Sequence, residues 1–353
     1  MERKPERLRV AIAGCHRMLK PDPGSHNFAA AFNAVPQIQV VAVFDRGADT
    51  RAQFRGCWEE VWGPISAYDD YEQMLEREAP DLVCIATRQT QHADQIEQAV
   101  QAGVRGILCD KPLATSLEEA DRIGAACQEV PLLFALDRRW LEGYREVCQL
   151  IAAGAIGPLT SMVAYGLPNL INHGCHWYDA MLALAGDLEP VWVSGLVDDV
   201  AGERADSRRR LDPSGRGQIG LADGLVLYLT PDGAHQGANM NFEISGEKGR
   251  LFLFDDAREN FIWLEEGPPG AGRMQPLEIA AGKGGWPAGA AMVRDLVEAV
   301  QTGRRTSCDV EQARRATEIG FAIHLSSQQR GARIDLPAVE RGLYLQSFPW
   351  GNE

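Results

Sequence analysis

The sequence lacks any run of about 18 consecutive apolar residues, so we expect no membrane span. Its first residues, Met1–Arg7, are charged and lack the apolar core of a secretory signal, which indicates a cytoplasmic protein. An excess of basic residues is also missing. The formal net charge of −14 argues against a nucleic-acid or anionic-membrane partner, because either would require a basic face.

Closely spaced cysteine pairs are absent too. The eight cysteines are scattered, and some, such as Cys84 and Cys109, lie in apolar strand-like runs. This pattern is typical of buried, reduced thiols rather than of a disulfide framework. The segments Gly14-Cys15-His16 and Gly174-Cys175-His176 resemble each other, but adjacent Cys and His lack the usual spacing of zinc ligands. We therefore predict no metal site.

The 353 residues are enough for two domains, and the first part of the chain alternates between strands and helices with short connections. This alternation predicts a parallel, doubly wound sheet. The expected strands are Leu8–Gly14, Ile38–Phe44, Asp81–Thr87, Val104–Cys109 and Pro131–Leu136, and the expected helices include Asn27–Val35, Asp69–Ala79 and His92–Ala102.

The pattern then changes to a mostly antiparallel sheet. Helices are expected at 144–153 and 173–185, strands at 160–165 and between Val191 and Glu265, and closing helices at 288–302 and 310–330. Asp223-Gly224 predicts a hairpin within the strand-rich region. We read 198–216, with its run Arg208–Arg210, and 267–285 as loops. The predicted fold class is α/β: an N-terminal Rossmann parallel sheet (1–125), then a C-terminal α+β domain (126–353) with a large, mostly antiparallel open sheet.

The first two strands end in residues that suit a dinucleotide site. Gly14 can make a tight turn, but His16 occupies the second glycine position of a phosphate-binding loop, and Lys20–His26 delays the helix. Asp45 ends the second strand, where a Rossmann fold hydrogen-bonds the adenosine ribose. The alternative is that Asp45 only caps a helix or turn.

The central motif is Cys109-Asp110-Lys111-Pro112. Pro112 stops the strand, and a lysine at the carboxyl end of a parallel strand points into the crevice where open α/β sheets bind ligands. Ser116 and Glu119 have capping-box spacing for the next helix. The alternative reading of Lys111 is a surface lysine in a turn.

With these residues the chain resembles the Gfo/Idh/MocA oxidoreductases, sugar and cyclitol dehydrogenases with a Rossmann domain and an α/β substrate domain. The resemblance runs from Leu8 to Pro337. It rests on residues 109–116, similar to a Glu-Lys-Pro motif with aspartate for glutamate, and on Ile85–Thr87 with His92, Asp137–Trp140, Asn172–Asp179, Glu243–Leu251 and Gly331–Pro337.

Four departures accompany the resemblance, the first of which is the glycine loop that is degraded at His16. Arg88-Gln89-Thr90 replaces a proline-rich turn, Asn172 stands where many members have a catalytic aspartate, and the chain continues for 16 residues beyond Pro337, with Phe348-Pro349-Trp350 unassigned.

The resemblance implies a set of cofactor contacts: Gly14, Cys15, His16, Arg17, Asp45, Arg46, Thr87, Arg88, His92, Asp110, Lys111 and Arg139. We expect NAD rather than NADP, because the Asp45 carboxylate would repel a 2′-phosphate, although Arg46 could receive one. Arg139 could instead be an ordinary salt-bridge arginine.

Oxidation of a secondary alcohol requires a hydride acceptor, a base and a positive group for the developing alkoxide. Asn172, His176 and Asp179 are spaced i, i+4, i+7, so we expect them on one helix face, with His173 off that stripe. The predicted catalytic residues are His176 as base, Lys111 as alkoxide stabiliser and Asn172 as a hydrogen-bonding group. The predicted substrate contacts are Lys111, Arg139, Asn172, His173, His176 and Asp179. His176 could alternatively be an ordinary buried histidine.

The leading function is therefore NAD-dependent oxidation, or reverse reduction, of a sugar, sugar derivative or cyclitol. Two alternatives stay open: a redox-neutral glycoside-cleaving enzyme that uses NAD transiently, and a nucleotide-binding protein without turnover. The resemblance also implies a homodimer or homotetramer formed through the open face of the second sheet.

Overall fold

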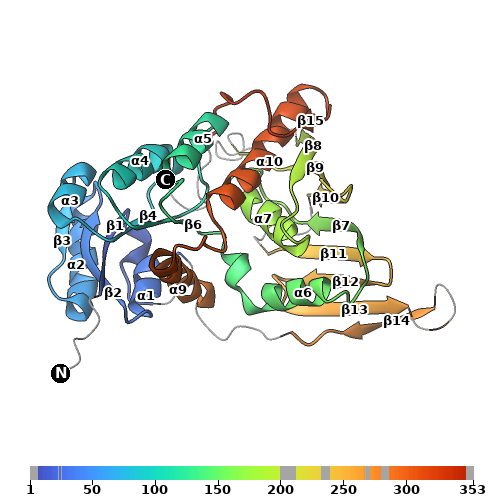
Figure 1. Ribbon diagram of the computed structural model, residues 1–353, viewed down its shortest axis with the longest axis horizontal. Helices are drawn as coiled ribbons and strands as arrows, with labels where there is room; N and C mark the ends of the chain where they lie inside the picture. Colours follow the sequence, from blue (N-terminus) through green and yellow to red (C-terminus); the bar gives the residue numbers. More distant parts are fainter. Residues whose placement is uncertain are drawn as a thin grey trace, which may run out of the picture. The chain divides into compact units, whose positions relative to one another are not determined.

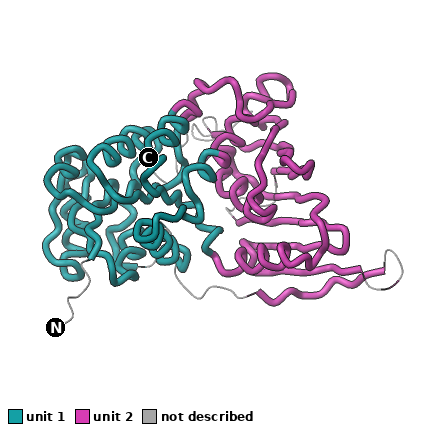
Figure 2. Tube along the Cα trace, in the orientation of Figure 1, with its two compact units in different colours: residues 1–114, 119–140, 283–314 teal, residues 115–118, 141–282, 315–353 magenta. Residues whose placement is uncertain are grey.

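The computed structural model describes residues 7–22, 24, 26–198, 212–231, 239–265, 267, 271–279 and 286–346. The chain divides into two compact units, coloured in Figure 2. Unit 1 comprises 1–114, 119–140 and 283–314, and unit 2 comprises 115–118, 141–282 and 315–353. This division is discontinuous, whereas the sequence prediction places a single boundary at residue 125. No helix in the described part of the chain is long and apolar enough to cross a membrane.

Unit 1 is built on a six-stranded sheet of order β3-β2-β1-β4-β5-β6, in which all registered pairs are parallel (Figure 1). The order reverses between β1 and β4, as in a doubly wound Rossmann sheet. The central strands are buried on both faces, as a sheet covered by helices requires. The strands are β1 (Leu8–Ala13), β2 (Ile38–Phe44), β3 (Ser66–Tyr68), β4 (Leu82–Ile85), β5 (Gly106–Cys109) and β6 (Leu132–Phe134).

Helices cover the sheet of unit 1. Helices α1 (Phe28–Asn33) and α9 (Pro287–Thr302) pack against each other, while α3 (Tyr71–Glu78) and α4 (His92–Gln101) form a second contacting pair. Asp70 caps α3 by accepting from the backbone N–H of Gln73 at 3.0 Å. The connections are completed by α2 (Ala48–Trp62), α5 (Leu117–Ala126) and the short 3₁₀ helices η1 (His16–Met18), η2 (Gln89–Gln91) and η3 (Asp137–Trp140).

Helix α9 returns to the first sheet although it lies late in the sequence. Small residues allow this close packing: a Cβ at Gly106 of β5 would lie 2.6 Å from the Val300 side chain, and one at Gly289 would lie 3.0 Å from Ala31 of α1. The helix was expected from its pattern, but we predicted it in the C-terminal domain.

Unit 2 carries a nine-stranded sheet of order β14-β13-β12-β11-β7-β10-β9-β8-β15, mostly antiparallel, with β7 and β10 parallel. The strands are β7 (Leu159–Tyr165), β8 (Pro190–Val197), β9 (Gly215–Leu221), β10 (Val226–Thr230), β11 (Asn241–Gly246), β12 (Gly249–Phe254), β13 (Glu259–Glu265), β14 (Gly272–Pro276) and β15 (Ile334–Asp335). The predicted hairpin joins β9 and β10, with Gly224 at φ +93°.

One face of this sheet is buried and the other is partly exposed. Met162, Leu227 and Ile244 point to the buried face, while Val163 and Tyr228 alternate with them on the other. Helices α6 (Glu142–Ala152), α7 (Gly174–Leu184) and the later part of α10 (Val310–Gln328) belong to the same unit (Figure 1).

The segment 338–346, which follows Pro337 and was unassigned from the sequence, contacts other parts of unit 2. The backbone N–H of Leu345 donates to the Thr115 carbonyl at 2.8 Å, and that of Glu118 donates to the Arg341 carbonyl at 3.1 Å. Arg341 also pairs with Glu318 of α10. Phe348-Pro349-Trp350 and the run Arg208–Arg210 lie outside the described residues.

One predicted loop is wrong. The region 267–285 contains β14, whose five residues are all exposed, so it carries no alternation of buried and exposed positions that would mark a strand. Helix α2 and strand β3 are further elements that the sequence analysis did not assign.

Candidate functional site

Four of the predicted cofactor segments meet at the carboxyl ends of neighbouring strands in unit 1. Gly14 follows β1 with φ +81°, and a Cβ there would lie 2.6 Å from the Ala86 carbonyl oxygen at the end of β4. Only glycine therefore fits between these two strand ends. The crevice at such a switch point is where open α/β sheets bind their ligands.

The loop after Gly14 is not a glycine-rich phosphate cradle. Residues His16–Met18 form the 3₁₀ helix η1, with His16 exposed, Arg17 half-buried and Met18 buried. The Met18 carbonyl accepts from the Trp58 indole at 2.7 Å. Burial, together with the nearby Asp45 carboxylate, raises the pKa of the Cys15 thiol, so Cys15 is a neutral group in this loop.

Asp45 ends β2 and lies beside the same loop. One carboxylate oxygen accepts from the Cys15 backbone N–H at 3.1 Å, and the other accepts from Gly47 N–H at 2.9 Å. The Arg51 guanidinium holds the Asp45 carbonyl at 2.6 Å, while Arg46 is exposed. Asp45 therefore connects the ends of β1 and β2 through hydrogen bonds, and its side chain is half-buried.

Asp110 and Lys111 follow β5 and are both buried, at 7% and 8% exposure. Nδ1 of His26 lies 3.1 Å from the Asp110 carboxylate. Burial alone would raise the pKa of Asp110, but the charges of His26, Lys111 and Arg17 outweigh it and hold that pKa below its usual range. His26 was not predicted as a partner of Asp110, because the two residues are 84 positions apart in the sequence.

His92 lies between the segment that follows β4 and the segment that follows β5. Its ring nitrogens lie 3.2 Å from the Leu113 carbonyl and 3.2 Å from the Thr87 carbonyl, and the residue is fully buried. Burial lowers its pKa, so the ring is neutral and can donate to only one carbonyl at a time. Thr87 donates its hydroxyl to Gln95 at 2.5 Å, and Arg88 is exposed.

The segment Asp137–Trp140 forms η3 in unit 1. Asp137 accepts from the Trp286 indole at 2.9 Å and pairs with Arg138 at 2.9 Å. Arg139 is half-buried and donates to the Ser307 carbonyl at 3.3 Å. Trp286 is a second residue that the sequence analysis missed.

The predicted helix face in unit 2 is only partly correct. Helix α7 begins at Gly174 with His173 as N-cap, so Asn172 lies before the helix and does not share a face with His176 and Asp179 through helical periodicity. The peptide N–H groups of Ile171 and Asn172 donate to the Asp212 carboxylate, both at 2.8 Å. Asp212 therefore fixes the turn that carries Asn172.

His176 and Asp179 remain one turn apart on α7 and are buried, at 4% and 1% exposure. His173 is half-buried, and its Nδ1 accepts from the Asn169 side-chain amide at 3.0 Å, which leaves the ring proton on Nε2. Asn169 and Asp212 are further residues that the sequence did not reveal, because neither has a recognisable spacing.

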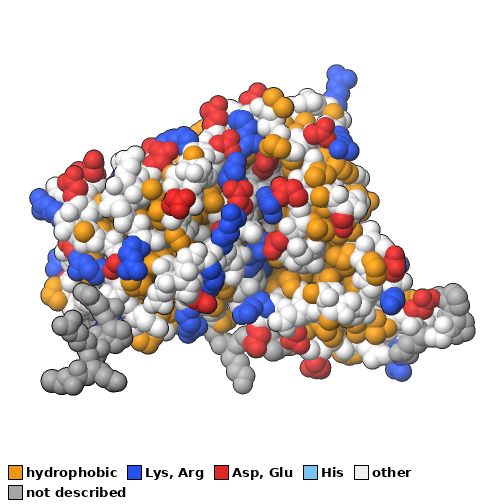
Figure 3. Space-filling model, viewed as in Figure 1, with side chains coloured by type: hydrophobic (Ala, Val, Ile, Leu, Met, Phe, Trp, Pro, Cys, Tyr) orange, Lys and Arg blue, Asp and Glu red, His pale blue; other side chains and the backbone are white. Residues whose placement is uncertain are grey.

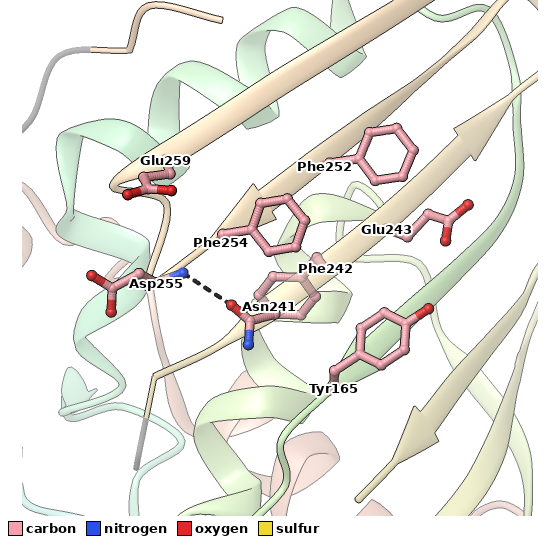
Figure 4. Close-up of a pocket in the computed structure, with 8 residues that line it drawn as sticks. All are labelled: Tyr165, Asn241, Phe242, Glu243, Phe252, Phe254, Asp255 and Glu259. Atoms are coloured by element: carbon pink, nitrogen blue, oxygen red, sulfur yellow. Dashed lines mark hydrogen bonds between the residues drawn. The ribbon is translucent and has the colours of Figure 1, made fainter. Parts of the chain in front are cut away.

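The partly exposed face of the unit 2 sheet carries a hollow of about 680 Å³ (Figure 4). Aromatic rings and carboxylates line it: Tyr165, Asn241, Phe242, Glu243, Phe252, Phe254, Asp255 and Glu259. On the face in Figure 3, acidic and basic side chains are interspersed. Within the described ranges, no group of three potential metal ligands occurs.

The part of the chain that carries the unit 1 segments is similar to known oxidoreductases. Residues 8–137 match the profile of the GFO_IDH_MocA oxidoreductases, described as a family with an NAD-binding Rossmann fold. The chain is 32% identical over 154 residues to a D-apiose dehydrogenase of Paraburkholderia graminis, but this match spans only 38% of that protein and 43% of this chain. It is 27% identical to a dTDP-3,4-didehydro-2,6-dideoxy-alpha-D-glucose 3-reductase of Actinomadura kijaniata, over 70% of this chain and 74% of that protein.

Solved structures support the fold over nearly the whole chain. Levoglucosan dehydrogenase in complex with NADH superposes with a TM-score of 0.78 at 18% identity, covering 95% of this chain and 100% of that one. This superposition shows the fold alone. The match over residues 8–137 confirms that this part of the chain resembles the Gfo/Idh/MocA oxidoreductases and their NAD-binding Rossmann fold.

Proposed function

We propose that the protein is an NAD-dependent oxidoreductase that transfers a hydride between the cofactor and a secondary alcohol of a sugar, sugar derivative or cyclitol. The observation that carries this proposal is a lysine, Lys111, at 8% exposure beside the ionised Asp110 at the carboxyl end of a Rossmann strand. Buried lysines are rare unless they are paired or functional. The names of the apiose dehydrogenase and the dideoxyglucose reductase support the substrate class.

Bound NAD would supply the hydride acceptor. Gly14 would allow close approach of the backbone to the cofactor, and Asp45 would receive the adenosine ribose hydroxyls, which would favour NAD over NADP. We further propose cofactor contacts from Cys15, His16, Arg17, Arg46, Thr87, Arg88, Asp110 and Arg139. His92, by contrast, braces Thr87 and Leu113, so we propose that it shapes this site from behind rather than touching the cofactor.

For the alcohol, we propose that His176 takes the hydroxyl proton and that the Lys111 ammonium stabilises the negative charge that develops on oxygen. Asn172 can donate or accept a hydrogen bond but has no useful basicity, so it orients the substrate. His173, Asp179 and Arg139 complete the proposed substrate contacts.

Absorbance of reduced nicotinamide, followed while a panel of sugars, cyclitols and glycosides is supplied with excess NAD, tests this function. We expect NADH to accumulate in proportion to a free sugar or cyclitol, and Lys111→Ala to abolish the signal. Glycoside cleavage that requires NAD but accumulates no NADH would instead identify the redox-neutral enzyme. Nucleotide binding without turnover of any panel member would overturn the catalytic proposal.

We also propose a homo-oligomer formed through the exposed face of the nine-stranded sheet. Phe254 of β12, which lines the hollow of Figure 4, is 41% exposed, and Tyr228 of β10 is 38% exposed on the same face. Exposed aromatic side chains around a hollow are typical of protein interfaces.

A further inference from the structure

His26 has an unusual backbone conformation and a specific partner. It lies just before α1 with φ +61°, in the left-handed region that residues other than glycine adopt only uncommonly. From there its Nδ1 reaches the Asp110 carboxylate at 3.1 Å, and the two side chains are only 18% and 10% exposed. The segment preceding α1 therefore contacts the residue next to Lys111 directly.

Asp110 is held on its backbone side as well. Its N–H donates to the Ile85 carbonyl of β4 at 2.8 Å, and its carbonyl accepts from the Cys109 thiol at 3.3 Å. Its carboxylate lies among the charges of His26, Lys111 and Arg17. A carboxylate in a poorly hydrated position requires directional donors, and the imidazole supplies one.

The imidazole is itself fixed by aromatic neighbours. Its ring lies 5.6 Å from that of Trp286, tilted by 31°, and 6.3 Å from the Phe28 ring in an edge-on arrangement. Trp286 in turn donates its indole N–H to Asp137 at 2.9 Å. These contacts join the segment of Asp110 and Lys111 to η3 through His26 and Trp286, all within unit 1.

We propose that His26 is a positioning residue for Lys111: it holds the Asp110 carboxylate, and so fixes the backbone that carries the lysine. The inference rests on the proposed function of Lys111.

Two substitutions separate the hydrogen bond from the backbone conformation. Glycine and asparagine both tolerate φ near +60°, so neither His26→Gly nor His26→Asn introduces strain. The asparagine amide nitrogen can occupy the position of Nδ1, whereas glycine removes the donor. We expect His26→Gly to lower kcat about tenfold with less than about threefold change in the Kd for NAD, and His26→Asn to recover most of the lost kcat.

Equal kcat values for the two variants, or a His26→Gly variant with wild-type kcat, would overturn the inference, since the donor would then be dispensable. If Lys111→Ala were fully active, the proposed role of Lys111 would fail, and that result is independent of the His26 variants.

The position of Lys111 can also be followed by NMR, which tests the inference whether or not the protein turns over a substrate. The sequence has five lysines, so ¹⁵N-lysine labelling gives a spectrum with few backbone amide signals, and Lys111→Arg identifies that of Lys111. We expect His26→Gly to shift or broaden the Lys111 signal while leaving that of Lys248 unchanged, and His26→Asn to restore it. An unaltered Lys111 signal in His26→Gly would refute the positioning role.

Discussion

The backbone N–H of Cys15 donates to the Asp45 carboxylate at 3.1 Å, which joins the ends of β1 and β2 at the crevice of the Rossmann sheet. This contact uses one side of the carboxylate and Gly47 uses the other oxygen, so the orientation of Asp45 is fixed before any ligand binds. If Asp45 contacts the cofactor as proposed, we expect this fixed acceptor to favour two ribose hydroxyls and to disfavour a phosphate.

Cofactor preference follows from this arrangement. We expect the wild-type protein to bind NAD at least tenfold more tightly than NADP, and Asp45→Ser to lose most of that preference because the repelling charge is gone. Calorimetric titration of both cofactors measures this. Asp49→Ser, which removes an exposed carboxylate from the first turn of α2, is the matched control and should keep the preference. Equal or tighter NADP binding by the wild type would contradict the prediction.

A substitution at Gly14 tests whether the close approach of the ends of β1 and β4 affects the free energy of unfolding. Gly14→Ala should reduce the free energy of unfolding more than Gly303→Ala, because both positions have positive φ but only at position 14 would the new Cβ lie 2.6 Å from a backbone oxygen. We expect about 1 kcal/mol at Gly303 and a further 1–3 kcal/mol, roughly, at Gly14. Urea unfolding of both variants gives the comparison; equal losses would show that the Ala86 carbonyl moves freely.

The catalytic roles predict losses in turnover rather than in binding. Lys111→Ala and His176→Ala should each lower kcat by about 10²-fold or more while the Kd for NAD stays within about threefold, because in the proposed roles both groups would act in the transition state. His173→Ala should cost less, since its Nδ1 is occupied by Asn169. Near-full turnover of His176→Ala together with loss in His173→Ala would mean that the base was assigned to the wrong histidine.

Strands and helices with regular apolar patterns were predictable from the sequence because each pattern is local. Strand β2 matches its predicted bounds, and α3 (Tyr71–Glu78) lies within the helix predicted at Asp69–Ala79. Strand β14 escaped prediction because none of its residues is buried, so pairing with β13 alone defines it.

Long-range contacts could not be predicted in this way. Nothing in the sequence indicates which sheet α9 covers. Its packing depends on Gly106, which is distant in the sequence, and on Gly289, which lies within the helix. The His26–Asp110 pair spans 84 positions and obeys no spacing rule. Similarly, the apolar pattern places a helix near residue 173, but the turn that excludes Asn172 from it is set by Asp212, from a distant segment.

The oligomer can be tested on the exposed sheet face. The double substitution Tyr228→Asp with Phe254→Asp should reduce the mass in light scattering to that of one chain, because two charges would be buried without partners. Val61→Asp, at a hydrophobic position 43% exposed on α2, should leave the mass unchanged. A wild-type protein that is monomeric at micromolar concentration would refute the proposed interface.

His324 gives the stability a defined dependence on pH. This α10 residue is 9% exposed, its Nε2 has no hydrogen-bond partner among the described residues, and burial lowers its pKa to about 4. The unfolded chain, with a pKa of about 6.5, binds the proton more readily, so stability is full above about pH 6.5 and falls as pH drops toward 4. At about pH 5 the loss from this one residue is about 2 kcal/mol.

His324→Leu should therefore be neutral or stabilising near pH 7.5, because a buried nitrogen without a partner is replaced by an apolar group, and it should remove most of the loss near pH 5. Urea unfolding of wild type and variant at both pH values measures the difference. His16→Leu, which alters an exposed histidine, is the control and should keep the wild-type slope. If wild type and His324→Leu lost equal stability on acidification, His324 would be protonated as easily in the folded chain as in the unfolded one, and its burial would have no role in acid sensitivity.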